Sequence, residues 1–103
     1  MNKKEISILF NQIVSDLQIT SKIELKVINI KRYKVCGTFC MRGNTVVIHI
    51  NKYHNKDIWE LHDTICHELA HIRCRKYHTQ RHRIITEWYK EATEYLIKDL
   101  ISC

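Results

Sequence analysis

The amino-acid sequence predicts a small α+β domain in which helices cover a three-stranded sheet. Apolar residues recur at helical spacing near both ends of the chain, whereas between residues 22 and 50 they alternate with polar ones or form short runs typical of strands. The chain has 103 residues, no proline and only two glycines, so nothing in it marks a linker between two domains. We therefore expect one domain over residues 1–103, with the order helix, three strands, helix, helix and a small antiparallel or mixed sheet, mostly antiparallel.

The first helix is predicted over residues 3–17, where polar side chains separate a helical row of apolar ones: Ile6, Leu9, Phe10, Ile13, Val14 and Leu17. Three strands follow, over residues 22–33, 34–41 and 45–50. The last two are joined by Arg42-Gly43-Asn44, a segment that tolerates the positive φ of a tight hairpin. Residues 45–50 are the most apolar of the three, so this strand should lie nearest the core and close to the next helix.

The second helix begins with Asp57 as its N-cap, because Glu60 follows three places later. One stripe of this helix is apolar and predicts the face that packs on the core: Ile58, Leu61, Ile65, Leu69 and Ile72. His67 and His71 lie roughly 140 to 150° from the centre of that stripe, which predicts that they face away from the core. His62 falls near the stripe and is expected to pack or hydrogen-bond in the interior.

The last helix is predicted over residues 79–101, with Thr79 as its N-cap. A long apolar stripe indicates it: Ile84, Ile85, Trp88, Ala92, Tyr95, Leu96 and Leu100.

The composition indicates a protein of a reducing compartment, which we take to be the cytoplasm. The five cysteines are an odd number without repeated Cys-x-x-Cys spacing, which argues against a disulfide framework or a zinc ribbon and favours small core residues. The start of the chain lacks the apolar core of a signal peptide, and no apolar run approaches a membrane span. The net charge is +6, with a dense basic run from Arg73 to Arg83 that favours a solvated basic face over a nucleic-acid site.

The stretch that carries chemistry is His67-Glu68-Leu69-Ala70-His71, a His-Glu-x-x-His pattern within the second predicted helix. The two histidines are one helical turn apart, so both imidazoles can reach a single metal ion. Glu68 points to a different side of the helix and is free to handle the proton of a metal-bound water. The pattern thus predicts a zinc site with Glu68 as general base.

A catalytic zinc usually takes three protein ligands and keeps one position for water. Four later side chains could supply the third ligand: His78, His82, Glu87 and Glu91. On an unbroken helix His78 would lie about 10 Å beyond His71 along the axis, out of reach. If His78 binds, the helix must therefore end between residues 74 and 77 and the chain must turn back.

The residues from about 35 to 92 resemble the small zincin metallopeptidases of the SprT-like, YgjP-like and WLM type. The resemblance rests on the His67 to His71 motif, on His78-Thr79-Gln80-Arg81 after six intervening residues, on the apolar last helix and on the hairpin that precedes the motif. It implies zinc bound by His67, His71 and His78, with Glu68 as general base. The chain departs from that pattern at His82, where an aromatic or aliphatic residue is usual.

A second resemblance is to minimal gluzincins, which take the third ligand as a glutamate of the next helix. For this chain that ligand would be Glu91 or, further out, Glu87. Judged by reach and register, we expect His78 first, a glutamate second and His82 third.

The function expected from this reading is peptide-bond hydrolysis by a zinc metalloendopeptidase. The tyrosines Tyr77, Tyr89 and Tyr95 and the nearby arginines are candidates to stabilise the oxyanion. An exposed edge of the strand near residues 45–50 could hold an extended peptide substrate. The alternatives are a non-catalytic zinc-stabilised module that binds nucleic acid through residues 73–83, and a protease restrained by self-association or by its own terminus.

Overall fold

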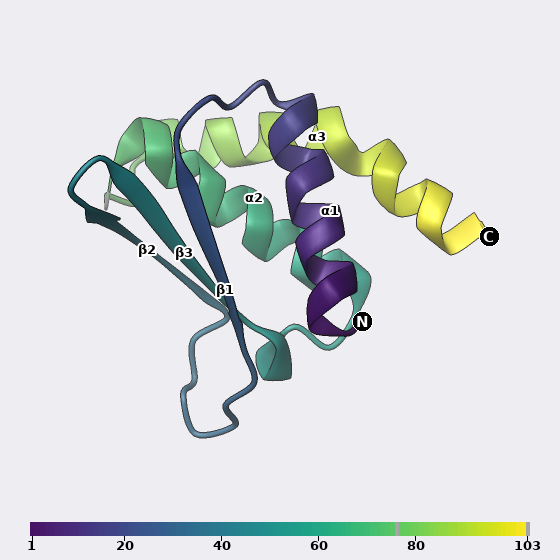
Figure 1. The fold of residues 1–103 in the computed structure, drawn as a ribbon. Coiled ribbons are helices and arrows are strands. Elements are labelled where there is room, and N and C mark those ends of the chain that lie inside the picture. The colour runs from purple at the N-terminus through teal and green to yellow at the C-terminus, as the bar shows by residue number, and fades with distance from the viewer. Residues whose placement is uncertain (76, 103) are drawn as a thin grey trace.

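The computed structural model describes residues 1–75 and 77–102 and has the predicted element order (Figure 1). It comprises α1 (Lys3–Asp16), β1 (Ile23–Ile28), β2 (Gly37–Arg42), β3 (Thr45–Asn51), the short 3-10 helix η1 (Lys52–His54), α2 (Ile58–Cys74) and α3 (Gln80–Ser102). The α+β class with three main helices and a three-stranded sheet is confirmed. The first two predicted strands were too long, since β1 ends at Ile28 and β2 begins only at Gly37.

The sheet has the order β1-β3-β2 and is mixed. The central strand β3 pairs in parallel with β1 and antiparallel with β2, so half of the pairing is parallel and the sheet is not mostly antiparallel. The segment between β1 and β2 carries the chain across to the far side of β3, which a simple meander would not do. Because both edges of β3 are paired, the prediction that residues 45–50 offer an edge to a peptide is wrong. The outer strands of the sheet are β1 and β2.

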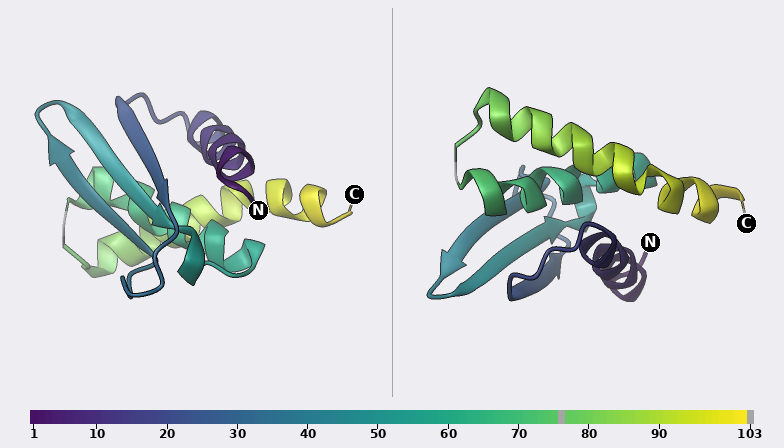
Figure 2. Two further views of the ribbon diagram at one scale, coloured as in Figure 1. Left: turned by 60° about the horizontal axis from the view of Figure 1, so that its bottom comes forward. Right: turned by 90° about the horizontal axis from the view of Figure 1, so that it is seen from above.

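The helices cover one face of this sheet in two layers. α2 lies against the sheet, and α3 lies on the far side of α2 (Figure 2). The core forms where α1, α2 and the sheet meet, and its fully buried members come from all three: Ile6, Leu9, Phe10, Ile13, Ile48, Ile50, Ile65 and Leu69. As predicted, β3 is the most buried strand and lies close to α2.

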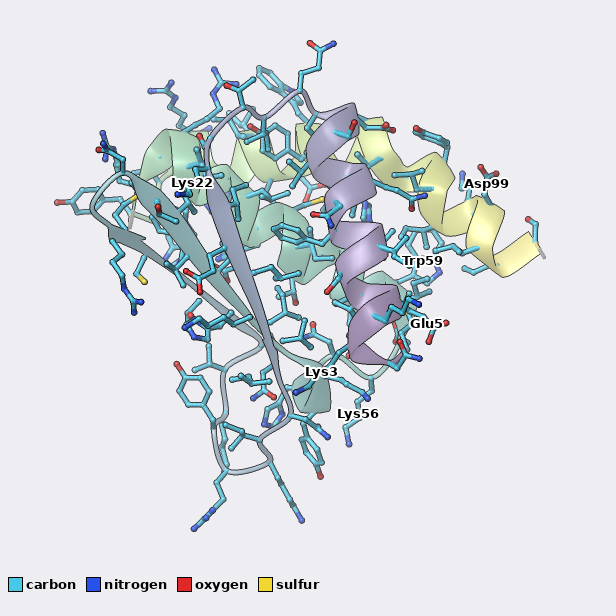
Figure 3. All side chains as sticks on the ribbon, viewed as in Figure 1. Lys3, Glu5, Lys22, Lys56, Trp59 and Asp99 are labelled. Atoms are coloured by element: carbon cyan, nitrogen blue, oxygen red, sulfur yellow. The ribbon has the colours of Figure 1, made fainter. Side chains whose placement is uncertain are left out.

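Both helices next to the sheet begin with side-chain caps. Glu5 lies in the first turn of α1 (Figure 3). Asn2 Oδ1 accepts from the backbone N–H of Glu5 at 2.8 Å, and the Glu5 carboxylate accepts from the Asn2 N–H at 2.9 Å. At α2, Asp57 Oδ1 accepts from the N–H of Glu60 at 2.9 Å, which confirms the predicted N-cap. These caps satisfy N–H groups that have no partner inside the helix.

α2 ends at Cys74, inside the interval predicted for its end. The next residue, Arg75, has φ 58° and ψ −147°, a backbone conformation otherwise left to glycine that costs on the order of 1–3 kcal/mol. The chain therefore turns sharply at a residue with a side chain, and its surroundings must compensate for the strain.

α3 packs through a face that is more polar than the sequence suggested. Thr79 Oγ1 accepts from the N–H of His82 at 3.3 Å, as expected for the N-cap. The buried residues of α3 are His82, Ile85, Thr86, Thr93 and Ile97. Several members of the predicted apolar stripe are instead 42–60% exposed: Ile84, Trp88, Tyr95 and Leu100. Part of the contact between α2 and α3 consists of hydrogen bonds, made by His62 with Thr93 and by His82 with the backbone of His67. The spacing of apolar residues cannot predict such polar contacts.

The cysteines follow their expectation only in part. Cys66 is fully buried, and burial raises the pKa of its thiol to about 12. Cys40 in the outer strand β2 and Cys36 just before that strand are exposed, so they are not core residues. All four described cysteines are free thiols, and Cys103 lies outside the described residues.

Candidate metal centre

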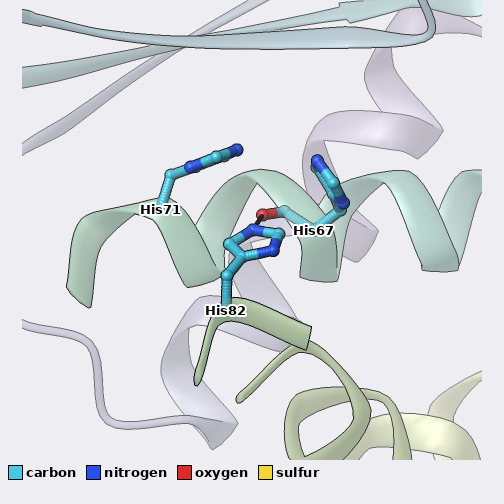
Figure 4. A group of neighbouring side chains, drawn as sticks. All are labelled: His67, His71 and His82. Carbon is cyan, nitrogen blue, oxygen red and sulfur yellow. Dashed lines mark hydrogen bonds between the residues drawn. The ribbon is translucent and has the colours of Figure 1, made fainter. Parts of the chain in front are cut away.

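Four histidines meet where the end of α2 faces the start of α3. His67 and His71 are one turn apart on α2, His78 lies between the two helices, and His82 lies in the first turn of α3. The six distances between their ring centroids run from 4.3 to 5.2 Å. Figure 4 shows His82 reaching from α3 toward the segment of α2 that carries His67 and His71. The turn after α2 thus brings together side chains that are up to fifteen positions apart.

The Nε2 atom of His78 lies close to Nε2 of both α2 histidines. His78 Nε2 lies 3.1 Å from Nε2 of His67 and 3.1 Å from Nε2 of His71. A single proton on His78 Nε2 could point at only one of these two nitrogens. A tetrahedral zinc ion with bonds of about 2.0–2.1 Å would hold its ligand nitrogens roughly 3.3–3.4 Å apart. Both measured separations are close to this value, as expected if His78 shares a metal ion with His67 and His71.

The ring of His71 is held in the orientation that such a site requires. Its Nδ1 is hydrogen-bonded to the carbonyl of Arg75, and because a carbonyl only accepts, Nδ1 carries the proton. The lone pair of the neutral ring then lies on Nε2, which faces His78. Phe39 stacks on the ring of His71, and the two ring centroids are 5.4 Å apart. His71 lies outside the apolar core stripe of α2, as predicted. The residue is nevertheless only 4% exposed, because Phe39 of β2 and His82 of α3 pack against its ring.

Burial keeps the α2 histidines in the form that binds metals. Desolvation, followed by the neighbouring His82, His71 and His78, lowers the pKa of His67 to about 4. Desolvation also lowers the pKa of His71, against the opposing effect of its bond to Arg75. Both rings are therefore neutral near pH 7, as metal ligands must be.

Glu68 lies against the first residue of β2. It is 5% exposed, and burial raises the pKa of its carboxyl to about 7. A Cβ atom on Gly37 would lie 3.1 Å from Glu68 Oε2 and 2.9 Å from Thr64 Cγ2, so only glycine permits this close approach. Sequence reasoning did not single out Gly37, although a glycine at the start of a strand is the usual sign of such an approach.

Glu68 and the three converging histidines open onto one hollow. It has a volume of about 250 Å³, and its other wall is the start of β2. The residues that line it are Gly37, Thr38, Phe39, His67, Glu68, His71 and His78. A carboxylate that titrates near neutrality thus shares a surface with a three-imidazole cluster. Such a pairing can bind a cation and move a proton beside it.

Comparison with known proteins agrees with this geometry. No family model matches the chain, and no curated protein matches it either. Its fold matches that of the crystal structure of the metallopeptidase zymogen of Methanocaldococcus jannaschii, jannalysin, with a TM-score of 0.65 and 25% sequence identity. The match covers 92% of this chain and 96% of that one. The chain has a small metallopeptidase-like fold.

Within this metallopeptidase-like fold the other candidate ligands lie less favourably. Glu87 shares a second hollow with His67 and His78, but its carboxylate is 57% exposed and lies 3.5 Å from Lys90 Nζ. Glu91 lines a different hollow, beside Trp59. Neither glutamate is thus placed as favourably as His78 beside His67 and His71.

His82 requires a separate decision. One ring nitrogen from each of His67, His71 and His82 lies within 4.8 Å of the other two, and this distance alone would suggest a metal site. His82 Nε2 lies 2.9 Å from the backbone carbonyl of His67 and donates to it, which leaves the lone pair of this ring on Nδ1. The shorter Nε2 contacts belong to His78, so the geometry favours His78 as the third ligand.

The candidates for oxyanion stabilisation separate clearly. Tyr95 donates to Asp16 of α1, and Tyr89 is packed against the core, so neither belongs to the hollow beside Glu68. Arg83 lines the hollow that contains His67 and His78. Tyr77 precedes His78 and is 61% exposed.

The basic run forms an exposed rim around the turn between α2 and α3, made by Arg73, Arg75, Arg81 and Arg83. Among residues 1–75 and 77–102, no helix is long and apolar enough to cross a lipid bilayer.

Proposed function

We propose that the protein is a zinc-dependent metallopeptidase that hydrolyses peptide bonds, with His67, His71 and His78 as metal ligands and Glu68 as general base. The observation that supports this most is that His78 Nε2 lies 3.1 Å from Nε2 of both His67 and His71, beside a buried glutamate. The fold match to a metallopeptidase zymogen supports the same class of activity.

Three imidazoles are a ligand set that suits zinc. When bound, a zinc ion would lower the pKa of a coordinated water toward about 7 and polarise the carbonyl of the scissile bond. Glu68 would accept a proton from that water and pass it to the leaving amine. Its pKa, raised by burial, suits this exchange near neutral pH, although a nearby cation would lower it.

We expect the substrate to be an extended peptide segment that pairs with β2. This strand is an edge strand of the sheet, and its first residues line the hollow that Glu68 opens onto. Backbone pairing with an edge strand binds peptides of many sequences, which suits a chain of 103 residues with little room for deep specificity pockets. Arg83 or Tyr77 would stabilise the developing oxyanion.

The finer assignment, to the SprT-like, YgjP-like and WLM type, belongs to this proposal. It is supported by a histidine after the turn in the position of the third ligand, whereas a gluzincin-like site would require a glutamate of α3. Among the described residues, both candidate glutamates are exposed and line other hollows.

The test is a comparison of Glu68→Gln with Glu87→Gln. The amide of Glu68→Gln keeps the shape of the carboxylate but cannot take a proton, so we expect zinc content to be retained while peptide cleavage falls on the order of 10²- to 10⁴-fold. Glu87→Gln changes an exposed carboxylate of α3 and should leave both quantities unchanged. Cleavage unaffected by Glu68→Gln would overturn the proposal.

A second candidate is a zinc-stabilised module that binds single-stranded nucleic acid. It is favoured by one hollow that brings Arg73 and Arg81 together with the exposed ring of Trp88, a combination suited to phosphates and stacked bases. Binding of a labelled oligonucleotide that weakens steeply with salt, and weakens further in Trp88→Ala, would support it. Salt-independent binding, or none, would exclude it.

A further inference from the structure

The buried histidine of α3 has no part in the proposed reaction, yet it is in contact with the whole cluster. His82 is 3% exposed. Its ring centroid lies 4.5 Å from that of His67, 4.3 Å from that of His71 and 5.2 Å from that of His78. A buried imidazole needs a hydrogen-bond partner, and the identity of that partner indicates the structural role of the ring.

That partner is the backbone of α2. His82 Nε2 lies 2.9 Å from the carbonyl oxygen of His67, and because a carbonyl only accepts, His82 Nε2 carries the proton (Figure 4). With the proton on Nε2, the lone pair of this ring lies on Nδ1, and the short contacts with Nε2 of His67 and His71 are made by His78 instead. The bond instead joins the first turn of α3 to the residue that supplies the first proposed ligand.

The backbone of His82 is fixed as well. Its N–H donates to Thr79 Oγ1 at 3.3 Å, and its carbonyl accepts from Thr86 Oγ1 at 2.8 Å. Thr79 is the residue directly after His78. The hydrogen bonds of His82 therefore run from the backbone of α2, through the imidazole, to the segment that holds His78.

We propose that His82 is a positioning residue, which packs against the three ligand imidazoles and fixes the distance of His78 from His67 and His71 without binding the metal itself. This inference rests on the proposed metal site. Groups that orient ligands typically change metal affinity by about 10- to 100-fold when they are removed. The part of His82 that matters is the proton donor at the position of Nε2, so a side chain that restores the donor should restore affinity.

The experiment measures binding of zinc and cobalt(II) to the full chain, without any substrate. Glutamine can place an N–H donor near the position of His82 Nε2, whereas leucine fills the buried space without a donor. We expect His82→Gln to bind metal within a few-fold of the unchanged chain and His82→Leu to bind about 10- to 100-fold more weakly. X-ray absorption should count three imidazoles in both variants, and the cobalt(II) absorption should stay tetrahedral.

A further variant covers the case in which His82→Leu does not fold. Thr79→Ala removes the acceptor of the His82 N–H without touching the ring, and we expect it to weaken metal binding by a few-fold with the ligand count unchanged. His78→Ala should remove one imidazole from that count.

Three results would overturn the inference. Loss of one imidazole in His82→Gln would make His82 a ligand, unchanged affinity in His82→Leu and Thr79→Ala would remove its positioning role, and no metal binding by the unchanged chain would remove the site. Failure of the proposed peptidase is distinguishable, because metal binding with the expected order of variants but without peptide cleavage would support positioning and reject only the reaction.

Discussion

Two histidine sites lie on α2, five residues apart, and each contains a buried ring, His62 in the first and His71 in the second. His62 is 2% exposed, and its Nε2 lies 2.7 Å from Thr93 Oγ1. The Thr93 hydroxyl donates its proton to the carbonyl of Tyr89, so it accepts from His62 and the chain of hydrogen bonds is complete. One turn and a half further on, His67 and His71 direct Nε2 toward a third imidazole nitrogen.

The difference teaches that burial does not identify a metal ligand. Desolvation is the first cause that lowers the pKa of His62, as it is for His67 and His71. The two sites differ in the partner of the ring nitrogen. His62 donates to a hydroxyl oxygen, which completes its hydrogen bonding. His67 and His71 instead face a ring nitrogen of His78, and a shared cation would bind the lone pairs of all three.

The strongest test of this difference removes one imidazole from each site. His71→Ala and His78→Ala should each weaken zinc binding by well over the roughly 100-fold that marks the loss of an orienting group, because a metal bond is lost. His62→Ala should keep zinc affinity and instead lower stability by about 1–3 kcal/mol, since a buried hydrogen bond is broken. Competition with a chromophoric chelator and thermal unfolding measure the two quantities. Zinc affinity that depends on His62 and not on His78 would reverse the assignment.

The next largest effect concerns the carboxylate beside the metal centre. Gly37→Ala places a methyl group against Glu68 and Thr64, so we expect zinc to be retained while kcat falls about 10- to 100-fold through displacement of Glu68. Adding Thr64→Ser removes the nearer clash with Cγ2 and keeps the hydroxyl that donates to Asn55, which separates strain at Thr64 from displacement of Glu68.

Gly43→Ala is the matched control for that variant. Gly43 has φ 61° in the β2–β3 turn, and an added Cβ would have no atom within 4 Å. It should cost about 1–2 kcal/mol of stability with kcat unchanged. Equal losses of kcat at both glycines would mean that Gly37 acts only through stability.

The His62 site should also respond to pH in a predictable direction. The pKa of His62 is lowered from its ordinary value of 6.5 in the folded chain, first by burial and then by Lys90. Below pH 6.5 the unfolded chain takes up a proton at this position and the folded chain does not, so the free energy of unfolding falls until the pH reaches the lowered pKa. Above pH 6.5 both states are neutral and the contribution is constant. Unfolding of the metal-free chain and of His62→Gln at several pH values should show less acid destabilisation in the variant, and parallel curves would contradict the assignment.

The sequence was sufficient for those parts of the site that one helix determines. The spacing of His67 and His71, the cap at Asp57 and the core stripe through Ile65 all follow from the helical period, and the structure has each of them. A helix that ended before residue 78 followed from the reach of His78. The backbone of Arg75, which makes that turn without glycine, could not be predicted, because residues with a side chain rarely adopt its conformation.

The parts that depend on pairing between elements were harder to predict. A hairpin pattern from β2 to β3 does not indicate that β1 pairs with the other edge of β3. For this one reason the sequence did not predict the parallel pairing, and it wrongly predicted that β3 has a free edge for substrate. The exposure of Trp88 and the burial of Thr93 likewise arise because α3 packs on α2 through hydrogen bonds. Gly37 could have been found, since the chain has only two glycines and this one opens a strand.

The smallest expected effect sharpens the electrostatic side of the His62 site. Lys90 lies 3.1 Å from Asp63 and 3.5 Å from Glu87, and its charge is the second cause that lowers the pKa of His62. Lys90→Met should cost less than about 1 kcal/mol in low salt and close to nothing in high salt, because these ion pairs are largely solvated. It should also let the His62 pKa rise toward 6.5, which reduces the loss of stability at acid pH even as stability at neutral pH falls slightly.

Lys98→Met, which removes the exposed Lys98 to Glu94 pair instead, should leave the pH dependence unchanged. If both variants shifted the acid limb equally, the effect would come from net charge and not from the proximity of Lys90 to His62.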